Sequence, residues 1–366
     1  MPKIVIDGRM ISSSGIGTYL SEIVKSIKSN YTVTDKVDDV SKSFHNKERL
    51  SFVQLNVNAN IYSLKEQVLL PKNIPSCDVF WSPHYNVPVF PVRARKRLVT
   101  IHDVYHLHNY EQLTFFQKMY VKTVMYAAVY NSDKIITVSA FSKNEILKYY
   151  ECDPDKILVI HNGVEQQVQL TDVNVVKAKY KLPEHYILFV GNVKPHKNLN
   201  VLIEAYLKLS TSIQDKYKIV IVGRKEGFIT GDQSIFNKIQ NNSILQKSIL
   251  FTGYVNQQDM DSLYTMASVF VFPSFYEGFG LPPLEAMKCS CPVIVSDIPS
   301  HQEVCNDAAL YFDPLDSSKL ALLLKEVLTD DCLRKTITEK GAIQIKKFTW
   351  KSSYDKHIQV FNDLLS

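Results

Sequence analysis

Short runs of apolar residues alternate along this chain with longer stretches in which apolar residues recur every three or four positions. The short runs are rich in valine and isoleucine, which favour strands, and the longer stretches have the spacing of amphipathic helices. This alternation is typical of parallel sheets, because a helix usually carries the chain back between two parallel strands. The pattern therefore predicts an α/β fold made of doubly wound, Rossmann-like domains.

The predicted elements fall into two series. In the first half of the chain, strands are predicted near residues 3–7, 78–82, 97–102, 134–138 and 157–160, and helices near residues 17–29, 112–131 and 140–150. In the second half, strands are predicted near residues 186–190, 218–223, 249–252, 268–272 and 292–295, with helices between them. Residues 30–60 are polar without a dominant period, so only weak strands and loops are expected there.

The length of 366 residues favours two domains of similar size, each large enough to bury its own core. An Asn-Gly pair closes the last strand of the first series, and polar sequence follows it, so a linker is expected near residues 162–184. We predict a first domain over residues 1–165, a second over residues 166–345 and a C-terminal helical segment over residues 346–366.

Composition narrows the class of protein. Hydrophobic residues make up 45% and charged residues 22%, and the net charge of +5 comes without the basic stripe that nucleic-acid binding needs. No apolar run has the length of a transmembrane helix, and the first residues are typical of a strand and not of a signal peptide. The 6 cysteines are scattered without a paired spacing, which predicts free thiols and a reducing, cytoplasmic location.

The segment with the most chemistry runs over residues 274–287, Ser-Phe-Tyr-Glu-Gly-Phe-Gly-Leu-Pro-Pro-Leu-Glu-Ala-Met. Its two glycines allow a ligand to approach the backbone, and the helix predicted to follow directs N–H groups and a positive dipole end at that ligand. Those groups suit a diphosphate, whereas the carboxylates of Glu277 and Glu285 suit sugar hydroxyls. The segment is therefore predicted to bind a nucleotide-sugar, the alternative being a buried helix start with two incidental acids.

The same segment resembles the motif of two glutamates separated by seven residues that marks the retaining family-4 glycosyltransferases. The matching positions are Pro273, Glu277, Gly278, Gly280, Leu281, Pro283, Glu285 and Ala286. The resemblance implies the GT-B fold, in which two Rossmann-like domains face a central cleft and the C-terminal tail packs back on the first domain. It also implies that Glu285 accepts the ribose hydroxyls. Glu277, a catalytic residue in this interpretation, would bind the donor sugar together with the backbone of Gly278, Phe279, Gly280 and Leu281.

The stretch from Gly191 to Asn198 follows a predicted strand and precedes a helix, a place where a lysine can meet a phosphate. A surface loop with solvated lysines is the simpler interpretation. The stretch resembles the Lys-Asn block of the family, however, and this implies that Lys197 binds the diphosphate and is catalytic. Asn192 takes the position at which many relatives have an arginine, and we predict that it too contacts the donor.

Further donor-binding candidates follow the next two predicted strands. Arg224 is a second candidate for the phosphates, with a solvated surface charge as an equal alternative. Tyr254 and Val255 follow a glycine at the position that contacts the nucleobase in the family. A turn glycine alone would produce the same pattern, so this prediction depends on the resemblance.

In the first half, Gly15-Ile16-Gly17 follows the first predicted strand and begins a helix. Position 20 is leucine, so the dinucleotide-binding pattern Gly-x-Gly-x-x-Gly is absent. The loop does resemble the glycine-rich loop of the family. This implies that Gly17 lies near the donor phosphates and that Gly15 and Ile16 lie near the acceptor.

Histidines end two strands of the first half. His102 and Asp103 end the strand predicted at 97–102, and side chains at the carboxyl end of a parallel strand face the ligand in such folds. A structural histidine is the general alternative, but the match to the His-Asp strand end of the family implies that His102 is catalytic and that Asp103 orients its ring. His84 is a second acceptor-binding candidate near the same edge.

A metal site and a membrane-binding surface are the remaining candidates. His106 and His108 lie near Asp103, but their spacing fits no standard ligand set and no Asp-x-Asp motif occurs, so no metal or other cofactor is expected. The basic run at 93–97 precedes the helix predicted at 112–131, which carries aromatic and basic side chains. A solvated amphipathic helix is the simpler interpretation, and peripheral docking on an anionic membrane is the alternative.

Together, the residues and the resemblance predict a retaining glycosyltransferase. The hexose would come from a nucleotide diphosphate sugar, for which GDP-mannose is the first choice and a dTDP- or UDP-sugar the second. It would go to a hydroxyl of a glycan or a polyprenyl-diphosphate-linked acceptor in O-antigen or capsule synthesis. The departing phosphate would take the acceptor's proton while a lysine and backbone N–H groups stabilise its charge. The alternatives are a nucleotide-sugar epimerase of the same fold and a nucleotide-sugar-binding subunit without turnover.

Overall fold

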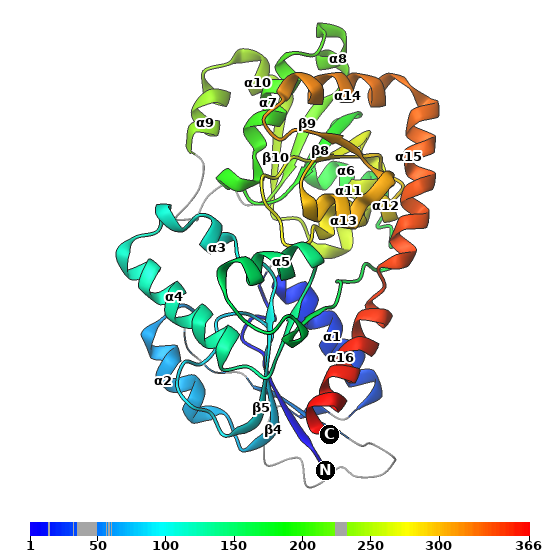
Figure 1. Ribbon diagram of the computed structural model, residues 1–366. Helices are drawn as coiled ribbons and strands as arrows, with labels where there is room; N and C mark the ends of the chain where they lie inside the picture. Colours follow the sequence, from blue (N-terminus) through cyan, green and yellow to red (C-terminus); the bar gives the residue numbers. More distant parts are fainter. Residues whose placement is uncertain are drawn as a thin grey trace. The chain divides into compact units, whose positions relative to one another are not determined.

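The computed structural model describes residues 1–13, 15–31, 33–34, 50–55, 57, 59, 61–223 and 233–366 of the chain. Contacts within the chain divide it into two units, Met1–Gly163 with Trp350–Ser366, and Val164–Thr349. In each unit, helices cover a parallel sheet (Figure 1). The α/β fold class predicted from the sequence is therefore confirmed.

Among the described residues, the first unit has a sheet of seven parallel strands in the order β2-β3-β1-β4-β5-β6-β7. They are β1 (Lys3–Asp7), β2 (Val33–Thr34), β3 (Ser51–Leu55), β4 (Cys77–Ser82), β5 (Ala94–Ile101), β6 (Lys134–Thr137) and β7 (Ile157–Val159). Both faces of β1 are buried, because Ile4 and Ile6 belong to one apolar cluster and Val5 to another. Strands buried on both faces are apolar at successive positions, which explains the continuous runs in the sequence.

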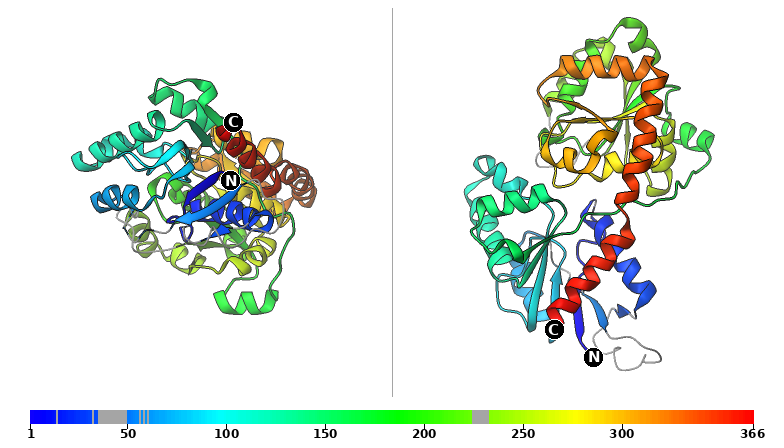
Figure 2. Two further views of the ribbon diagram at one scale, coloured as in Figure 1. Left: turned by 90° about the horizontal axis from the view of Figure 1, so that it is seen from below. Right: turned by 45° about the vertical axis from the view of Figure 1, so that its right-hand side comes forward.

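Helices from the first half of the chain, together with the last helix of the chain, cover this sheet. They are α1 (Ile16–Asn30), α2 (Leu64–Asn73), α3 (Tyr105–His108), α4 (Phe115–Tyr130), α5 (Ala140–Tyr149) and α16 (Trp350–Leu365), with 3₁₀ turns at Tyr110–Gln112 and Pro154–Lys156. The red α16 packs beside the blue α1 (Figures 1 and 2). Phe361 of α16 is fully buried against Phe52 and Trp81, and His357 Nε2 lies 2.6 Å from the hydroxyl of Tyr19. The tail of the chain is therefore part of the core of the first unit.

The second unit has six parallel strands among its described residues, in the order β10-β9-β8-β11-β12-β13. They are β8 (Tyr186–Val190), β9 (Lys218–Val222), β10 (Ile249–Gly253), β11 (Val269–Phe272), β12 (Val293–Ser296) and β13 (Leu310–Phe312). The strand order runs outward in both directions from the pair β8 and β11. In open α/β sheets ligands bind beyond the carboxyl ends of the strands at such a switch point. In the first sheet the corresponding pair is β1 and β4.

The helices of the second unit enclose its sheet. They are α6 (Val173–Tyr180), α7 (Leu199–Leu207), α8 (Thr211–Lys216), α9 (Gln233–Gln240), α10 (Ser243–Ser248), α11 (Gln257–Met266), α12 (Leu281–Lys288), α13 (Pro299–Cys305), α14 (Ser317–Thr329) and α15 (Asp331–Gln344), with 3₁₀ turns at Pro195–Lys197, Asn306–Ala308 and Ile345–Lys347. Phe189 of β8, Leu202 of α7 and Leu324 of α14 are fully buried in one core cluster. This packing fixes the carboxyl end of β8.

The structure confirms the predicted strands and helices and corrects several of their boundaries. β5 begins at Ala94, within the basic run, because that run pairs with β4 while some of its side chains stay exposed. α4 begins later than expected, because Thr114 and Gln117 form a capping box at its start. The region 30–60 contains β3, which is buried beside β1. The expected linker at 162–184 contains α6.

The sequence also predicted free thiols and no transmembrane helix. The cysteines are free, and of them only Cys332 is exposed. No described helix combines the length and the apolar character that crossing a membrane requires.

Candidate functional site

The segments that follow β8 and β11 meet at the switch point of the second sheet. The backbone N–H of Phe275, after β11, donates to the carbonyl of His196, after β8, at 2.8 Å. Lys197 ends the 3₁₀ turn in the segment after β8, and the left-handed φ of 52° at Asn198 turns the chain into α7. The Lys-Asn block and the two-glutamate segment, far apart in the sequence, are therefore neighbours.

Lys197 and Glu277 form an ion pair at this junction. Nζ of Lys197 lies 2.5 Å from Oε1 of Glu277 and 5.0 Å from the ring centroid of Phe272. Both side chains of the pair are mostly buried, with 19% and 14% of their surface exposed. Burial alone would raise the pKa of Glu277, but the charge and hydrogen bond of Lys197, together with smaller contributions from Ser274 and His196, outweigh it, and the pKa is lowered. Glu277 is therefore ionised at neutral pH.

The N-terminus of α12 lies on the same segment as Glu277. Gly280, directly before the helix, has a φ of 97°, a left-handed conformation that glycine adopts without strain. Pro282 and Pro283 carry no N–H, so Gly280 and Leu281 supply the backbone donors at this end. No side chain of a described residue caps the helix. These N–H groups and the positive end of the helix dipole suit a phosphate.

The turn between Glu277 and α12 is tightly packed. Gly278 and Phe279 are buried, and the Phe279 ring lies 5.7 Å from that of Phe348. The Phe279 side chain therefore has a packing role, which leaves only its backbone for the predicted ligand. At the other end of α12, Ser290 has a left-handed φ of 54°. Glycine and asparagine are the residues that usually adopt this conformation after a helix, so Ser290 is an unusual residue at this position.

Glu285 projects from α12 toward α11. Its Oε2 accepts a hydrogen bond from the hydroxyl of Tyr264 at 3.0 Å. Burial raises the pKa of Glu285, and the bond from Tyr264 and the charge of Lys288 offset this only in part. Among the described residues Oε1 has no hydrogen-bond partner, so it remains available to hydroxyl groups. The sequence reasoning missed Tyr264, because nothing in the pattern of α11 distinguishes it.

Glycines end three adjacent strands of the second sheet, at Gly191, Gly223 and Gly253. A Cβ on Gly223 would lie 2.2 Å from the carbonyl oxygen of Gly191, so these two loops touch through bare backbone. Asn192 follows the first of these glycines and is partly exposed. Arg224 follows the second and lies outside the described residues.

The predicted nucleobase contacts follow β10. Tyr254 exposes 70% of its surface, and Val255 is buried. Within the described part of the chain, no hydrogen bond or ion pair joins either residue to Lys197 or Glu277. Their role with the nucleobase stays a prediction.

His301, at the start of α13, is a site residue that the sequence reasoning missed. Its Nδ1 lies 2.9 Å from the carbonyl oxygen of Ser296, and its buried Nε2 has no hydrogen-bond partner among the described residues. Burial lowers the pKa of His301 to about 4, so the ring is neutral and its proton is on Nδ1. A Cβ on Gly280 would lie 3.8 Å from Nε2, and the Phe272 ring lies 5.3 Å away. Its position after a strand end was the available signal.

In the first unit, the glycine-rich loop leads from β1 into α1. Ile16 is the first residue of this helix, and Gly15, before it, has a φ of 72° and open space around the position that a Cβ would take. A Cβ on Gly17 would lie 2.6 Å from the carbonyl oxygen of Ile11. Gly17 therefore lets α1 pack closely on the preceding loop. This geometry does not test the predicted contact between Gly17 and the donor, which stays a prediction.

His102 follows β5 and lies at the carboxyl edge of the first sheet. Its Nε2 lies 2.9 Å from the carbonyl oxygen of Pro83, and its ring is edge-on to Tyr19 with centroids 4.8 Å apart. Pro83 therefore orients the His102 ring, a role that we predicted for Asp103. Asp103 instead accepts the backbone N–H of Tyr105, the first residue of α3, at 3.0 Å.

Histidines and tyrosines gather at the same edge. The Tyr85 ring lies 4.2 Å from His84 and 4.4 Å from His106, and Tyr62 lies 6.0 Å from His84. Across the described ranges, no three histidine, cysteine, aspartate or glutamate side chains are grouped so that they could hold a metal ion.

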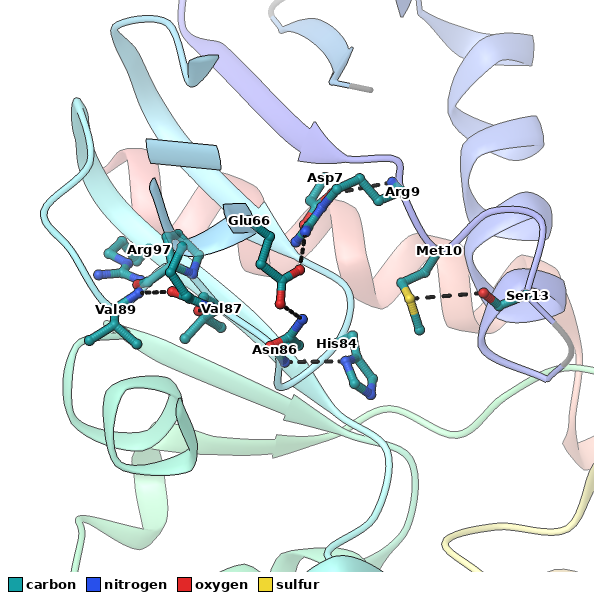
Figure 3. A network of polar contacts seen from close by, with 12 residues as sticks. Asp7, Arg9, Met10, Ser13, Glu66, His84, Asn86, Val87, Val89 and Arg97 are labelled. Atoms are coloured by element: carbon teal, nitrogen blue, oxygen red, sulfur yellow. Dashed lines mark hydrogen bonds and ion pairs between the residues drawn. The ribbon is translucent and has the colours of Figure 1, made fainter. Parts of the chain in front are cut away.

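A buried ionic network lies beyond the ends of β1 and β4 (Figure 3). Nη2 of Arg9 lies 2.7 Å from Oδ2 of Asp7, and Nη1 lies 2.5 Å from Oε2 of Glu66. Asn86 donates to Oε1 of Glu66 at 2.8 Å, and its own backbone N–H donates to Nδ1 of His84 at 3.2 Å. The sequence reasoning missed this network, although Arg9 follows a strand end.

Two doubly wound units, each built on a parallel sheet, have the architecture of the GT-B class of glycosyltransferases. Residues 173–344 match the model of glycosyl transferases group 1, and residues 52–168 match that of glycosyltransferase family 4.

Sequence relatives agree with this class. The O-antigen chain mannosyltransferase B of Escherichia coli is 30% identical over 283 residues, which cover 76% of this chain and 73% of that protein. The O-antigen chain mannosyltransferase RfbU of Salmonella typhimurium is 32% identical over 244 residues, 67% of this chain and 63% of that protein. The serotype-specific mannosyltransferase WbdA of Escherichia coli is 28% identical, and this chain spans 35% of its length. The chain belongs to the group 1, or family 4, glycosyltransferases.

Solved structures show the same fold at low sequence identity. Sucrose-phosphate synthase from Thermosynechococcus elongatus superposes with a TM-score of 0.75 at 18% identity, over 100% of this chain and 99% of that one. Anabaena HepE in complex with UDP-glucose superposes with a TM-score of 0.76 at 14% identity, over 99% of this chain and 100% of that one.

Proposed function

We propose that this glycosyltransferase moves a hexose from a nucleotide diphosphate sugar to a hydroxyl of a glycan or a polyprenyl-diphosphate-linked acceptor. The observation that carries the proposal is the pair of Lys197 and Glu277, 2.5 Å apart, which joins the segment before α7 to the segment that leads into α12. The ammonium and the helix N-terminus suit a diphosphate, and the carboxylate suits sugar hydroxyls. The names of the relatives, mannosyltransferases of O-antigen chains, make mannose the favoured sugar. GDP-mannose is therefore the proposed donor.

The proposed reaction breaks one bond and forms one. The acceptor oxygen bonds to the anomeric carbon while the bond from that carbon to the phosphate oxygen breaks, and its electron pair leaves with the nucleoside diphosphate. Lys197 and the N–H groups of Gly280 and Leu281 stabilise the charge that grows on this leaving group. The acceptor's proton goes to the departing phosphate oxygen. Attack from the face of the leaving group retains the anomeric configuration.

Each carboxylate has its own part in this proposal. The Lys197 ammonium has three donors, so it can bind a phosphate oxygen while it still holds Glu277. Glu277 then presents its second oxygen to the hydroxyls of the donor sugar, and Glu285 presents Oε1 to the ribose hydroxyls. His102 positions the sugar or the acceptor.

Two substitutions at the pair test the proposal. We expect Glu277→Gln to lower kcat by about 100-fold or more, because the group acts on the transition state. We expect Lys197→Ala to weaken GDP-mannose binding by about tenfold or more, measured by calorimetry, because a charged hydrogen bond to phosphate is lost. Lys179→Ala is a matched control, since it removes another lysine–carboxylate pair of the second unit, with Asp259 at 2.6 Å, and should change neither quantity.

Product analysis with and without acceptor completes the test. Transfer predicts that free nucleoside diphosphate appears only when acceptor is present, and that a new glycoside accumulates with it. Conversion of the donor alone to an epimer would contradict the proposal, and so would unchanged turnover in the Glu277→Gln variant.

We also propose that α4 makes peripheral contact with an anionic membrane. Phe115, Phe116 and Met119 expose 70%, 81% and 55% of their surface, while Val124 and Met125 of the same helix are buried. Exposed aromatic residues near lysines favour binding at a lipid interface. Co-sedimentation with phosphatidylglycerol vesicles that is lost in a Phe115→Ser, Phe116→Ser variant would support this contact, and equal sedimentation of the variant would contradict it.

A further inference from the structure

His84 and His102 leave the first sheet from neighbouring strands. β4 and β5 pair in parallel with Ser82 beside Val99, so the residues just beyond them lie at the same carboxyl edge. Their charges would interact, since each protonated ring would disfavour protonation of the other. The chemistry that this edge offers to a ligand depends on which ring nitrogens carry protons.

The Pro83 carbonyl fixes the protonation of His102. A carbonyl oxygen only accepts hydrogen bonds, so Nε2 of His102, 2.9 Å from it, carries the proton. Burial lowers the pKa of His102 more than the Pro83 bond and the charge of Asp103 raise it, and the ring is neutral at pH 7. Nδ1 is therefore a bare lone pair. Among the described residues it has no hydrogen-bond partner.

A hydrogen-bond donor sets the tautomer of His84, whereas an acceptor sets that of His102. The backbone N–H of Asn86 donates to Nδ1 of His84 at 3.2 Å, so in the neutral ring the proton is on Nε2. Burial, followed by the charges of His102, His106 and Arg9, lowers the pKa of His84 well below its ordinary value. Nε2–H of His84 is thus a donor at neutral pH. In the described part of the chain, no residue accepts from it.

The buried network behind His84 holds this arrangement in place (Figure 3). Asn86 donates from Nδ2 to Glu66 at 2.8 Å, and the Tyr120 hydroxyl lies 2.7 Å from Asn86 Oδ1 and 2.6 Å from Glu66 Oε1. Glu66 is fully buried and is paired with Arg9 at 2.5 Å. Burying these charges has a large desolvation penalty, so stability alone is a poor reason for the network. It does keep the Asn86 N–H aimed at the His84 ring.

We propose that His84 is a specificity residue that donates from Nε2 to an uncharged hydroxyl of a carbohydrate, beside Nδ1 of His102, whose contact with the sugar or the acceptor belongs to the function proposed above. Hydroxyl groups both accept and donate, so the hydroxyls of a carbohydrate can meet a donor such as His84 Nε2 and an acceptor such as His102 Nδ1. A phosphate or carboxylate only accepts and would face the lone pair of His102, and an ammonium only donates and would face the N–H of His84. The proposal rests on the proposed transferase function and makes His84 a specificity residue for it.

An aromatic surface beside the two histidines supports a sugar as the ligand. Tyr62 exposes 52% of its surface and lies 6.0 Å from the His84 ring. Its φ of 66° is a left-handed conformation that strains a tyrosine, and such strain gathers at ligand-binding positions. An aromatic side chain of this kind offers an apolar face and a polar tip to an amphipathic ligand. A sugar ring, with apolar faces and a hydroxylated edge, has that character.

The first experiment observes the two rings without any substrate. Long-range ¹H–¹⁵N NMR of the histidine-labelled wild-type chain distinguishes the neutral tautomers from the imidazolium form, and His84→Gln and His102→Gln variants assign the signals. We expect both rings to be neutral with the proton on Nε2 at pH 7. A proton on Nδ1 of His84, or an imidazolium at either ring, would overturn the proposal. This result does not depend on activity, so it separates a failure here from a failure of the proposed function.

The second experiment compares His84→Leu with His84→Gln in steady-state transfer assays. Leucine removes the donor, and glutamine keeps an N–H group at a similar reach. We expect the leucine variant to raise one KM by about tenfold, the equivalent of one hydrogen bond, and the glutamine variant to restore most of the loss. A raised KM for the acceptor places the hydroxyl on the acceptor glycan, and a raised KM for the donor places it on the donor sugar.

A remote histidine provides the control for these assays. His185, beside Tyr217 in the second unit, takes no part in the network, and His185→Leu should leave both KM values unchanged. Equal KM values for the leucine variant and the wild type would overturn the proposal, and so would equal defects in the leucine and glutamine variants.

Discussion

Lys197 contacts groups of two kinds, the carboxylate of Glu277 at 2.5 Å and the face of the Phe272 ring at 5.0 Å. A mostly buried ion pair adds little to stability, because the desolvation of both charges offsets their attraction. The aromatic face favours a cation at the same place. We infer that these contacts position an ammonium group where a diphosphate arrives, and that function explains the pair better than stability does.

Another buried residue, His357, links protonation to the stability of the first unit. Burial lowers its pKa to about 4, although the Ser353 carbonyl opposes this shift. His357 therefore binds a proton near pH 6.5 in the unfolded chain but stays neutral at that pH in the folded chain. Stability should be fully present above pH 6.5 and should fall by about 1.4 kcal/mol per pH unit below it, until the folded ring titrates.

Urea unfolding of the wild type and of His357→Gln measures this contribution. Both tryptophans, Trp81 and Trp350, lie in the first unit, so their fluorescence reports on the unit that contains His357. The difference in unfolding free energy between the two proteins should shrink as the pH falls from 6.5 to 5. Parallel curves would show that His357 does not titrate differently in the folded state.

The residues of the donor half could be predicted from sequence as far as local motifs reach. The carboxylates and glycines of the 274–287 segment lie in one continuous motif, and Lys197 lies in another. Tyr264 and His301 belong to no motif, because only the packing of α11 and α13 brings them to Glu285 and Gly280. Their roles depend on contacts between elements, which no local pattern encodes.

The packing of one helix, α1, on the loop before it depends on Gly17. A Cβ at this position would lie 2.6 Å from the Ile11 carbonyl oxygen and 3.0 Å from that of Met10, and both obstacles are backbone atoms. We therefore expect Gly17→Ala to lower the unfolding free energy of the first unit by about 2 kcal/mol. Ser21→Ala on the same helix is the control and should change it by less than about 0.5 kcal/mol.

Tryptophan fluorescence during urea unfolding measures both variants. A Gly17→Ala protein as stable as the Ser21→Ala protein would mean that the loop moves aside at little cost. In that case the glycine would be required for the ligand, as the resemblance implies, and not for the packing of α1.

The helices and strands themselves were predictable where one physical signal dominates. Buried parallel strands such as β9 appear as continuous apolar runs, and the sequence places them correctly. β3 was assigned only weakly, because Ser51 and Gln54 interrupt its apolar pattern although both are buried. α6 was taken for linker, because it is short and only Val176 of its residues is buried.

Across the full chain, the C-terminal segment completes a unit that begins at the N-terminus. Phe361 and Leu364 of α16 are buried in the core beneath α1. Deleting residues 351–366 removes these side chains together with His357. Loss of one large buried aromatic residue alone costs about 3–5 kcal/mol. We therefore expect the first unit of the truncated chain to unfold at lower urea concentration or to fail to fold.

The second unit provides the control for this truncation. It spans Val164–Thr349 and retains all its residues in the truncated chain, so GDP-mannose binding, measured by calorimetry, should persist. A tryptophan transition unchanged from the full chain would contradict the assignment of α16 to the core of the first unit.

The two series of strands predicted the division into two doubly wound units, but they did not show which sheet α16 covers. Contacts assign Val164–Thr349 to the second unit and return the chain to the first at Trp350. Periodicity identifies α16 as a helix without naming the sheet that it covers, because its apolar stripe would fit any apolar surface. That information lies in contacts with residues far away in the sequence, such as that of His357 with Tyr19.

The proposed chemistry requires that the junction of β8 and β11 binds a nucleotide diphosphate sugar. A crystal structure of the Glu277→Gln variant with GDP-mannose would decide this, because slow turnover preserves the donor. We expect diphosphate oxygens within hydrogen-bonding distance of Lys197 Nζ and of the N–H groups of Gly280 and Leu281, with the sugar beside residue 277. A donor bound elsewhere, with no phosphate oxygen near Lys197, would refute the proposed site.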